Sequence, residues 1–300
     1  MKDNILTVFT PAYNRADLLK RCYNALKNQT DKDFVWIIVD DGSKDNTRET
    51  VAQWIKEDKD IDIRYFYKEN GGLHTAYNVA VENMDTELCV CIDSDDYPSN
   101  NCVELIKKCW NDRDKSKDYA GIFGLNYTPE GELIGGEIDD YDEINIVDWT
   151  IGNYPVKKGD KKVVVRVDLY KQGFPMRVFE GEKNFNPNYV NILSGVNRPY
   201  ISLNECLCYV DYQQTGMTNN MLWQYYNSPN SFAEIRLLYL SFSNAPIQFL
   251  LKNCVHYDSS CILARRKGFI KECPHPVMAT FCLPLGFLLS RYVKLKNRGR

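Results

Sequence analysis

Four short apolar runs in the first hundred residues are each followed directly by a polar or glycine-containing loop. The loops are Thr10–Arg15, Asp40–Ser43, Asn70–Gly72 and Asp93–Asp96. The segments between the runs carry apolar residues at the three- and four-residue spacing of a helix. Strands that alternate with helices form a parallel sheet covered on both faces, and the loops after the strands meet at one edge. The sequence therefore predicts an α/β fold with a ligand site at that edge.

The expected elements follow this periodicity along the chain. We expect strands over residues 5–10, 34–39, 63–67, 88–92, 119–126, 163–167 and 200–211. We expect helices over residues 15–28, 47–56, 73–83, 102–110, 220–226 and 231–243. Residues 129–160 are predicted to be loop-like, and residues 173–190 to be irregular. The regular alternation of strand and helix is therefore expected to end near residue 118.

Composition limits the classes of protein and partner. With 300 residues, a net charge of -3 and a pI near 5.8, the chain is not expected to bind nucleic acid. Its eleven cysteines are scattered without zinc-ligand spacing, which predicts buried reduced thiols and a cytoplasmic protein. No signal peptide is expected at the start. The longest apolar block, residues 277–289, is interrupted by Pro284 and is expected to be too short to span a membrane.

Together the four loops resemble the signatures of the family 2 glycosyltransferases, which are inverting enzymes of the GT-A fold. Thr10–Arg15 is similar to the opening loop of that family, and Asp40–Ser43 to its second signature. Lys68–Gly72 is similar to the third, and Asp93-Ser94-Asp95 to its DxD element. The resemblance covers residues 5–215. The stretch 181–217 is similar to bacterial members that build capsular or surface polysaccharides.

The resemblance implies a Rossmann-like, mostly parallel sheet with helices on both faces and a helical C-terminal extension. Residues 1–215 are then the GT-A domain, with a nucleotide-binding half (1–118) and an acceptor or catalytic half (119–215). Residues 216–300 are the extension. The implied reaction moves a hexosyl or N-acetylhexosaminyl group from a UDP-sugar to a hydroxyl of a glycan or polyprenyl-phosphate-linked acceptor.

A divalent cation site is expected at the DxD element. Asp93 and Asp95 follow a buried strand, and alternate residues share one face, so both carboxylates can converge on one site. Carboxylate oxygens hold Mg²⁺ or Mn²⁺, which would stabilise the departing diphosphate. By the resemblance, Asp95 is the main ligand and Asp93 lies nearer the ribose. The alternative is an acidic loop that caps the next helix.

The other loops are expected to bind the nucleotide. Asp41 is predicted to accept a hydrogen bond from the N3–H of uracil, and Tyr13 to stack on the base or line its pocket. Gly71 and Gly72 are predicted to aim backbone amides outward at a helix start. The remaining expected contacts are Thr10, Pro11, Arg15, Lys68, Asn70 and Ser94. The alternatives are an ordinary turn at Asp41 and an exposed, salt-bridging Lys68.

An inverting transfer needs a general base that takes the proton of the acceptor hydroxyl. The resemblance places an acidic residue in this segment, and Glu182 is our first candidate with Glu180 second. Glu182-Lys183 departs from the usual Glu-Asp pair, and Pro187 is followed by Asn188 where similar enzymes carry Glu. The alternative is that either Glu braces a loop by pairing with a neighbouring cation.

Two rival functions come from other classes. A non-catalytic sugar-nucleotide-binding protein of the same fold remains open because Asn188 cannot act as a base. A nucleotidyltransferase would need a glycine-rich basic loop after the first strand, and Thr10–Arg15 is not such a loop.

The last residues combine an apolar block, 281–289, with a basic block, 291–300. This pattern is typical of a helix that lies on a membrane surface. The alternative is a core helix with a solvated basic end. We expect a protein that is peripheral at the inner face of the cell membrane, where a lipid-linked acceptor would be found.

Overall fold

The computed structural model describes residues 5–212 and 220–298. The chain divides into two compact units, Met1–Pro175 with Val190–Gln213, and Met176–Tyr189 with Gln214–Arg300. Our expected boundary at 215/216 lies close to the third and last crossing of the chain between the units. The segment 176–189, which we placed in the first domain, belongs to the second unit. The resembling stretch 213–217 lies outside the described residues.

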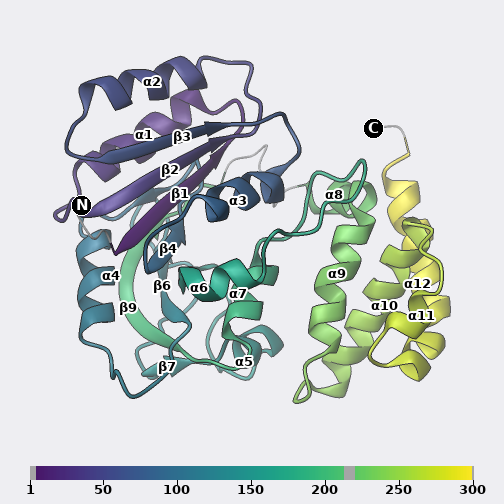
Figure 1. Ribbon diagram of the computed structural model, residues 1–300. Helices are drawn as coiled ribbons and strands as arrows, with labels where there is room; N and C mark the ends of the chain where they lie inside the picture. The colour runs from purple at the N-terminus through teal and green to yellow at the C-terminus, as the bar shows by residue number, and fades with distance from the viewer. Residues whose placement is uncertain (1–4, 213–219, 299–300) are drawn as a thin grey trace. The chain divides into compact units, whose positions relative to one another are not determined.

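The first unit is built on a nine-stranded sheet in the order β3-β2-β1-β4-β8-β6-β9-β5, with β7 paired to β9 (Figure 1). The strands are β1 (Leu6–Ala12), β2 (Phe34–Asp40), β3 (Asp62–Tyr67), β4 (Leu88–Cys91), β5 (Tyr97–Pro98), β6 (Gly121–Tyr127), β7 (Glu143–Ile144), β8 (Lys161–Arg166) and β9 (Tyr200–Tyr209). β1 to β4 are parallel, as expected, but β8 is antiparallel to both β4 and β6. The sheet is therefore mixed beyond β1 to β4.

Helices cover both faces of this sheet. The helices of this part of the chain are α1 (Ala16–Lys27), α2 (Thr47–Glu57), α3 (Leu73–Glu82), α4 (Cys102–Asn111), α5 (Ile146–Ile151), α6 (Val167–Gln172) and α7 (Asn188–Gly195). On one face α1, α2 and α4 share a core with the strands, in which Tyr23 stacks on Trp54 at 4.3 Å between ring centroids. On the other face Tyr77 of α3 meets Phe9 of β1 edge-on at 4.9 Å.

Residues 129–160, which we expected to be loop-like, contain β7 and the short helix α5. Local chemistry explains α5, because the side chain of Asn145 accepts hydrogen bonds from the amides of Val147 and Asp148. Gly152 ends the helix in the left-handed conformation, with φ of 90°.

The parallel register brings the predicted loops to one edge. Ala12 pairs with Asp40, Asp40 pairs with Tyr67, and Phe9 pairs with Cys91. The loops that follow β1, β2, β3 and β4 therefore lie at one edge of the sheet, at the carboxyl ends of the strands. This is where α/β folds bind ligands.

The second unit is helical. It contains α8 (Met221–Asn227), α9 (Pro229–Leu240), α10 (Ile247–Leu263), α11 (Phe269–Glu272) and α12 (Pro276–Lys296). α10 packs against both α9 and α12 (Figure 1). Its core includes Ala233 of α9, Cys254 and Tyr257 of α10, and Ala279 of α12.

α12 corrects our expectation about the apolar block. The helix continues through Pro284 for 21 residues, and it is the one helix in the described residues that is long and apolar enough to cross a membrane. Pro284 is exposed, so its ring lies away from the packed face. We expected Pro284 to interrupt the block because a proline removes a helical hydrogen bond, but the helix continues through it.

The close approach of α12 to α10 depends on Gly286. A Cβ at this position would lie 2.5 Å from the Cβ of Asp258 and 3.2 Å from the backbone nitrogen of Ser259. We predict that Gly286→Val destabilises the second unit by about 1–3 kcal/mol, the usual cost of overpacking. Leu285→Val, on the exposed side of the same turn, is the matched control. Denaturant unfolding measures both, and equal losses would contradict this account.

Candidate functional site

The first and second loops are tied together by Asn14. Its backbone nitrogen donates to Oγ of Ser43 at 2.9 Å, and its Oδ1 accepts from the backbone nitrogen of Lys44 at 2.7 Å. Asn14 has a φ of 53°, a left-handed conformation that Asn adopts more readily than most residues. These bonds fix the position of the neighbouring Tyr13 and Arg15 at the sheet edge.

The second and third loops are tied together by the buried carboxylate of Asp41. Lys68 Nζ and the Gly71 amide donate to Oδ1 at 2.5 and 2.9 Å. Asn70 Nδ2 and the Gly72 amide donate to Oδ2 at 3.1 and 2.8 Å. A carboxylate offers about four lone-pair sites, so in this arrangement all are used. Lys68 and the glycine amides, predicted to face the nucleotide, face Asp41 instead.

The four donors on Asp41 affect its predicted role in recognising uracil. The N3–H of a base would have to displace or share one of these four donors to reach Asp41. The role of Asp41 in base recognition stays a prediction, and its role in joining two loops is visible in the contacts. Asp40 supports the same loop, since it accepts from Tyr65 Oη at 2.6 Å and from the Ser43 amide at 2.7 Å.

The opening loop divides into buried and exposed residues. Thr10 and Pro11 are buried within β1, and Thr10 Oγ1 accepts from Nε1 of Trp36 at 3.0 Å. Their side chains therefore support the strand, and their contact with a nucleotide stays a prediction. Tyr13 is 44% exposed, as a residue that stacks on a base must be. Arg15 is close enough to Asp95 to counteract the rise in that carboxyl's pKa.

The DxD loop is held from two sides. Arg21 of α1 donates to the backbone oxygen of Asp95 at 2.5 Å and to Oδ2 of Asp211 at 2.8 Å. Asp96 in turn accepts from the Asp211 amide at 3.1 Å. The side chains of Asp93 and Asp95 remain partly exposed, whereas Ser94 is buried. The loop therefore presents two carboxylates to solvent on a fixed backbone.

Burial and mutual repulsion make this a strained cluster of negative charge. Burial, and then the charge of Asp93, raise the pKa of the Asp95 carboxyl above its ordinary value. Burial raises the pKa of Asp96 to about 7, although the charge of Lys162 opposes the rise. Each shift is in the direction that a bound cation would reverse.

Lys162 is a buried cation near the DxD loop that the sequence patterns did not reveal. It comes from β8, is 8% exposed, and donates to the backbone oxygen of Cys91 at 3.2 Å. Burial disfavours its ammonium, but Cys208, Asp96 and Asp93 outweigh that effect and raise the pKa of Lys162. The ammonium of Lys162 therefore compensates part of the negative charge of Asp93 and Asp96. The signal was a lysine at the edge of an apolar run, which we left outside the predicted strand.

The DxD pair suits a divalent cation that shares its ligands with a substrate. Within residues 5–212 and 220–298, no three His, Cys, Asp or Glu side chains form a ready-made metal site. Mg²⁺ characteristically binds through one or two carboxylates plus substrate phosphates. Asp93 and Asp95 match that donor set, and the raised pKa of Asp95 shows the unfavourable charge that a cation would relieve.

Glu182 lies in the second unit, at the start of α9. Its Oε1 accepts from the backbone nitrogen and Nδ2 of Asn230, and its Oε2 from the backbone nitrogen and Oγ of Ser231, all at 2.6–2.9 Å. The side chain is buried. A carboxylate here satisfies free amides at a helix N-terminus and favours the helix dipole. We had expected a bracing Glu to pair with a nearby cation, but Glu182 braces a helix. Glu180 is exposed.

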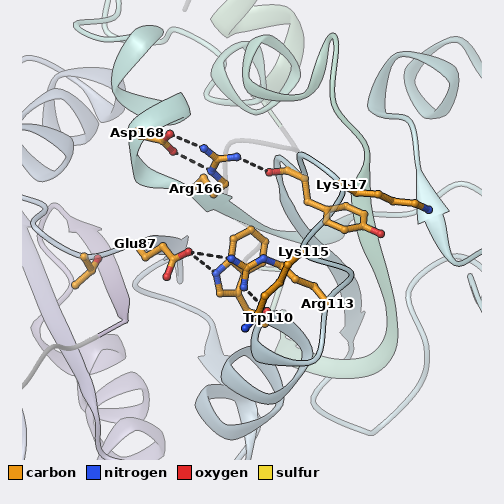
Figure 2. A pocket seen from close by; sticks show the side chains of 9 residues that line it. Glu87, Trp110, Arg113, Lys115, Lys117, Arg166 and Asp168 are labelled. Atoms are coloured by element: carbon orange, nitrogen blue, oxygen red, sulfur yellow. Dashed lines mark hydrogen bonds and ion pairs between the residues drawn. The ribbon is translucent and has the colours of Figure 1, made fainter.

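A cavity of about 480 Å³ lies elsewhere in the first unit (Figure 2). Its walls include Glu87, which precedes β4, and Arg166, which ends β8. It therefore opens at the end of β4 opposite to the DxD loop. Both arginines of its wall are paired, Arg166 with Asp168 at 2.6 Å and Arg113 with Glu87 at 3.4 Å. None of the predicted site residues lines it.

Residues 7–120 match the family model for glycosyl transferase family 2. The resemblance to family 2 glycosyltransferases that the sequence predicted is confirmed over these residues. The matched residues contain all four loops and both DxD carboxylates. A chondroitin synthase of Pasteurella multocida is 34% identical over 132 residues, which are 43% of this chain and 13% of that protein. A teichoic acid poly(glycerol phosphate) polymerase of Staphylococcus epidermidis is 32% identical over 112 residues, 37% of this chain and 15% of that protein. The chain thus spans a small part of these relatives.

Solved structures show the GT-A fold over almost the whole chain. Staphylococcus aureus TarS 1–349 in complex with UDP-GlcNAc has a TM-score of 0.66 at 17% identity, covering 98% of this chain and 91% of that one. The mannosyltransferase PcManGT of Pyrobaculum calidifontis, with GDP-Man and Mn²⁺, has a TM-score of 0.56 at 17% identity, covering 97% and 80%. The expected α/β fold with a helical extension is confirmed.

The contacts of Asp41 lead to a testable prediction. Asp41→Asn removes the charge and turns an NH₂ group toward donors that need an acceptor. We expect a loss of about 1–3 kcal/mol in unfolding free energy, because buried donors are left unsatisfied, together with weaker UDP binding. Glu49→Gln, in the first turn of α2, is the control. Denaturant unfolding and calorimetry with UDP measure the two effects, and unchanged values in both would contradict the role of Asp41.

Proposed function

We propose that this protein is an inverting glycosyltransferase that moves a sugar from a UDP-sugar to a hydroxyl of a glycan or lipid-linked acceptor in bacterial surface polysaccharide synthesis. The observation that supports this most is the meeting of four family 2 loops at one sheet edge around Asp93 and Asp95. The relatives named as polysaccharide and teichoic acid enzymes support the acceptor class.

The chain's own residues would bind and orient the donor. Tyr13 offers an exposed ring for the base, and Arg15 offers a charge beside the DxD loop. Asp41 and Gly71-Gly72 hold the neighbouring loops in place. We propose a uridine nucleotide and a hexosyl or N-acetylhexosaminyl donor, in keeping with the UDP-GlcNAc bound by TarS.

Asp95 and Asp93 would hold Mg²⁺ or Mn²⁺. The cation, when bound, stabilises negative charge on the departing diphosphate. Arg21 fixes the backbone of Asp95, so that this carboxylate is oriented before the donor binds. Lys162 keeps the acidic cluster from repelling itself apart.

For the general base, the contacts of Glu182 change our order of candidates. Four donors already occupy its oxygens in a buried position, which leaves no lone pair for an acceptor hydroxyl. We therefore propose Glu180, which is exposed, as the base. We also propose that the protein works in the cytoplasm at the inner face of the membrane, where a polyprenyl-phosphate-linked acceptor would be available.

The metal site is tested at Asp95. We expect Asp95→Ala to abolish Mn²⁺-dependent UDP binding while the fold is retained, a larger loss than the ~10–100-fold typical of groups that only support a metal ligand. Asp17→Ala, whose side chain is 91% exposed on α1, is the control. Calorimetry with UDP, with and without Mn²⁺, is the measurement. Unchanged metal dependence of UDP binding in the Asp95 variant would contradict the assignment of Asp95 as a metal ligand.

The base is tested with two matched substitutions. We expect Glu180→Gln to lower release of UDP from UDP-sugars in the presence of acceptor by about 100-fold or more, with unchanged UDP affinity. We expect Glu182→Gln to lower the unfolding free energy by about 2 kcal/mol, since hydrogen bonds to a charged group are lost. Turnover lost in Glu182→Gln at unchanged stability would restore our original order.

The same assay separates the second candidate function. If the parent binds UDP-sugars but transfers nothing to any glycan or lipid-linked acceptor, the chain is a sugar-nucleotide-binding protein. Asn188, which stands where similar enzymes carry Glu, is the residue that favours this alternative.

A further inference from the structure

The helix α12 has two faces of opposite character. The face against α10 is made of small or β-branched residues, Ala279, Cys282, Gly286, Ser290 and Val293. The opposite face carries the large apolar side chains. A helix of a water-soluble bundle normally buries its large apolar residues, so α12 has the reverse arrangement.

Six of the exposed apolar residues of α12 form one continuous stripe. Val277, Phe281, Leu288 and Leu295 follow one another at four, seven and seven residues, so they lie on one side of a helix with 3.6 residues per turn. Their exposed fractions are 69, 79, 62 and 56%. Leu285 and Tyr292 extend the stripe sideways and are 57 and 49% exposed. At 1.5 Å per residue the stripe is about 27 Å long, which is too large to be scattered surface apolarity.

Positive charge accompanies the stripe. Residues 273–300 contain no Asp or Glu, although the whole chain has a net charge of -3. The cations Arg291, Lys294, Lys296 and Arg298 are exposed at one end of α12. Lys296 lies 5.9 Å from the ring centroid of Tyr292. An apolar stripe next to cations complements the surface of an anionic lipid bilayer, which has an apolar interior and negatively charged headgroups.

α8 extends this surface beside the last turn of α12. Asn297 Nδ2 donates to the backbone oxygen of Leu222 at 3.2 Å, which places α8 next to the end of α12. α8 exposes Met221, Leu222 and Trp223 at 55, 44 and 47%. Trp and Tyr are the aromatic residues that favour the boundary between lipid tails and water.

We propose that α12 lies flat in the interface of an anionic lipid bilayer. The stripe inserts at the boundary between headgroups and acyl chains, and Arg291, Lys294 and Lys296 bind lipid phosphates. The helix does not span the bilayer, because its opposite face is committed to α10 through Gly286. The inference names the partner and residues for the proposed membrane location, and it does not depend on the transfer reaction.

The experiment is flotation of the full chain with vesicles. One set contains phosphatidylcholine alone, and the other equal parts of phosphatidylcholine and phosphatidylglycerol. The test variants are Phe281→Ser/Leu288→Ser and Lys294→Gln/Lys296→Gln. The control is Val178→Ser, which removes a 62% exposed apolar side chain from the same unit. UDP binding in every variant shows that the first unit is intact.

We expect the parent and the control to float with the anionic vesicles and to be released by high salt. The double Ser variant should lose ~10-fold or more of its partition onto lipid. The double Gln variant should lose about 30-fold, since each cation contributes about 1 kcal/mol at an anionic surface and 1.4 kcal/mol is tenfold.

Four results would overturn the inference. The parent could remain soluble with anionic vesicles at low salt, or the double Ser variant could float like the parent. Resistance of the parent to both high salt and alkaline extraction would indicate a spanning helix. If light scattering shows a dimer that the double Ser variant loses, and neither protein binds vesicles, the stripe is covered by a second copy of this chain.

Discussion

One buried carboxylate, that of Asp41, holds the loops at the carboxyl edge of the sheet in their observed form. It joins the loop after β2 to the loop before α3 through four hydrogen bonds. Gly42 permits this approach, because a Cβ there would lie 2.7 Å from the backbone nitrogen of Asn70. The glycines of these loops therefore allow backbone to pack on backbone around a charge. The exposed Tyr13 depends on the same edge, since Asn14 is bonded to the second loop.

The acidic cluster around the DxD loop depends on a balance between aspartates and two cations. Asp93, Asp95, Asp96 and Asp211 lie together, and two cations from distant parts of the chain hold them. Arg21 comes from α1, and Lys162 from the antiparallel strand β8. Because β8 lies directly beside β4, a lysine on it can reach the carbonyl of Cys91 just before the DxD loop. The remaining negative charge suits a divalent cation and a diphosphate.

In the second unit, the roles of Glu182 and of α12 are set by the helices that they contact. Glu182, in a segment that resembles catalytic loops, binds the first amides of α9. The same unit carries α12, whose buried face is lined by small residues and whose exposed face is apolar. The role of Glu182 follows from its contact with α9, and the buried face of α12 follows from its contact with α10. Periodicity alone gives the presence of each helix but not its partner.

Local patterns in the sequence are enough to predict β1 to β4, the helices between them, and the loops with Asp93 and Asp95. Those signals are contiguous, since apolar runs, glycine turns and acidic pairs each lie within a few residues. Only the packed chain sets the direction of β8, the burial of Thr10, the donors on Asp41 and Glu182, and the reach of Lys162. Each of these joins residues far apart in the chain. Hydrogen bonding and burial select such pairs only after the sheet and helices have packed, so no spacing in the sequence records them.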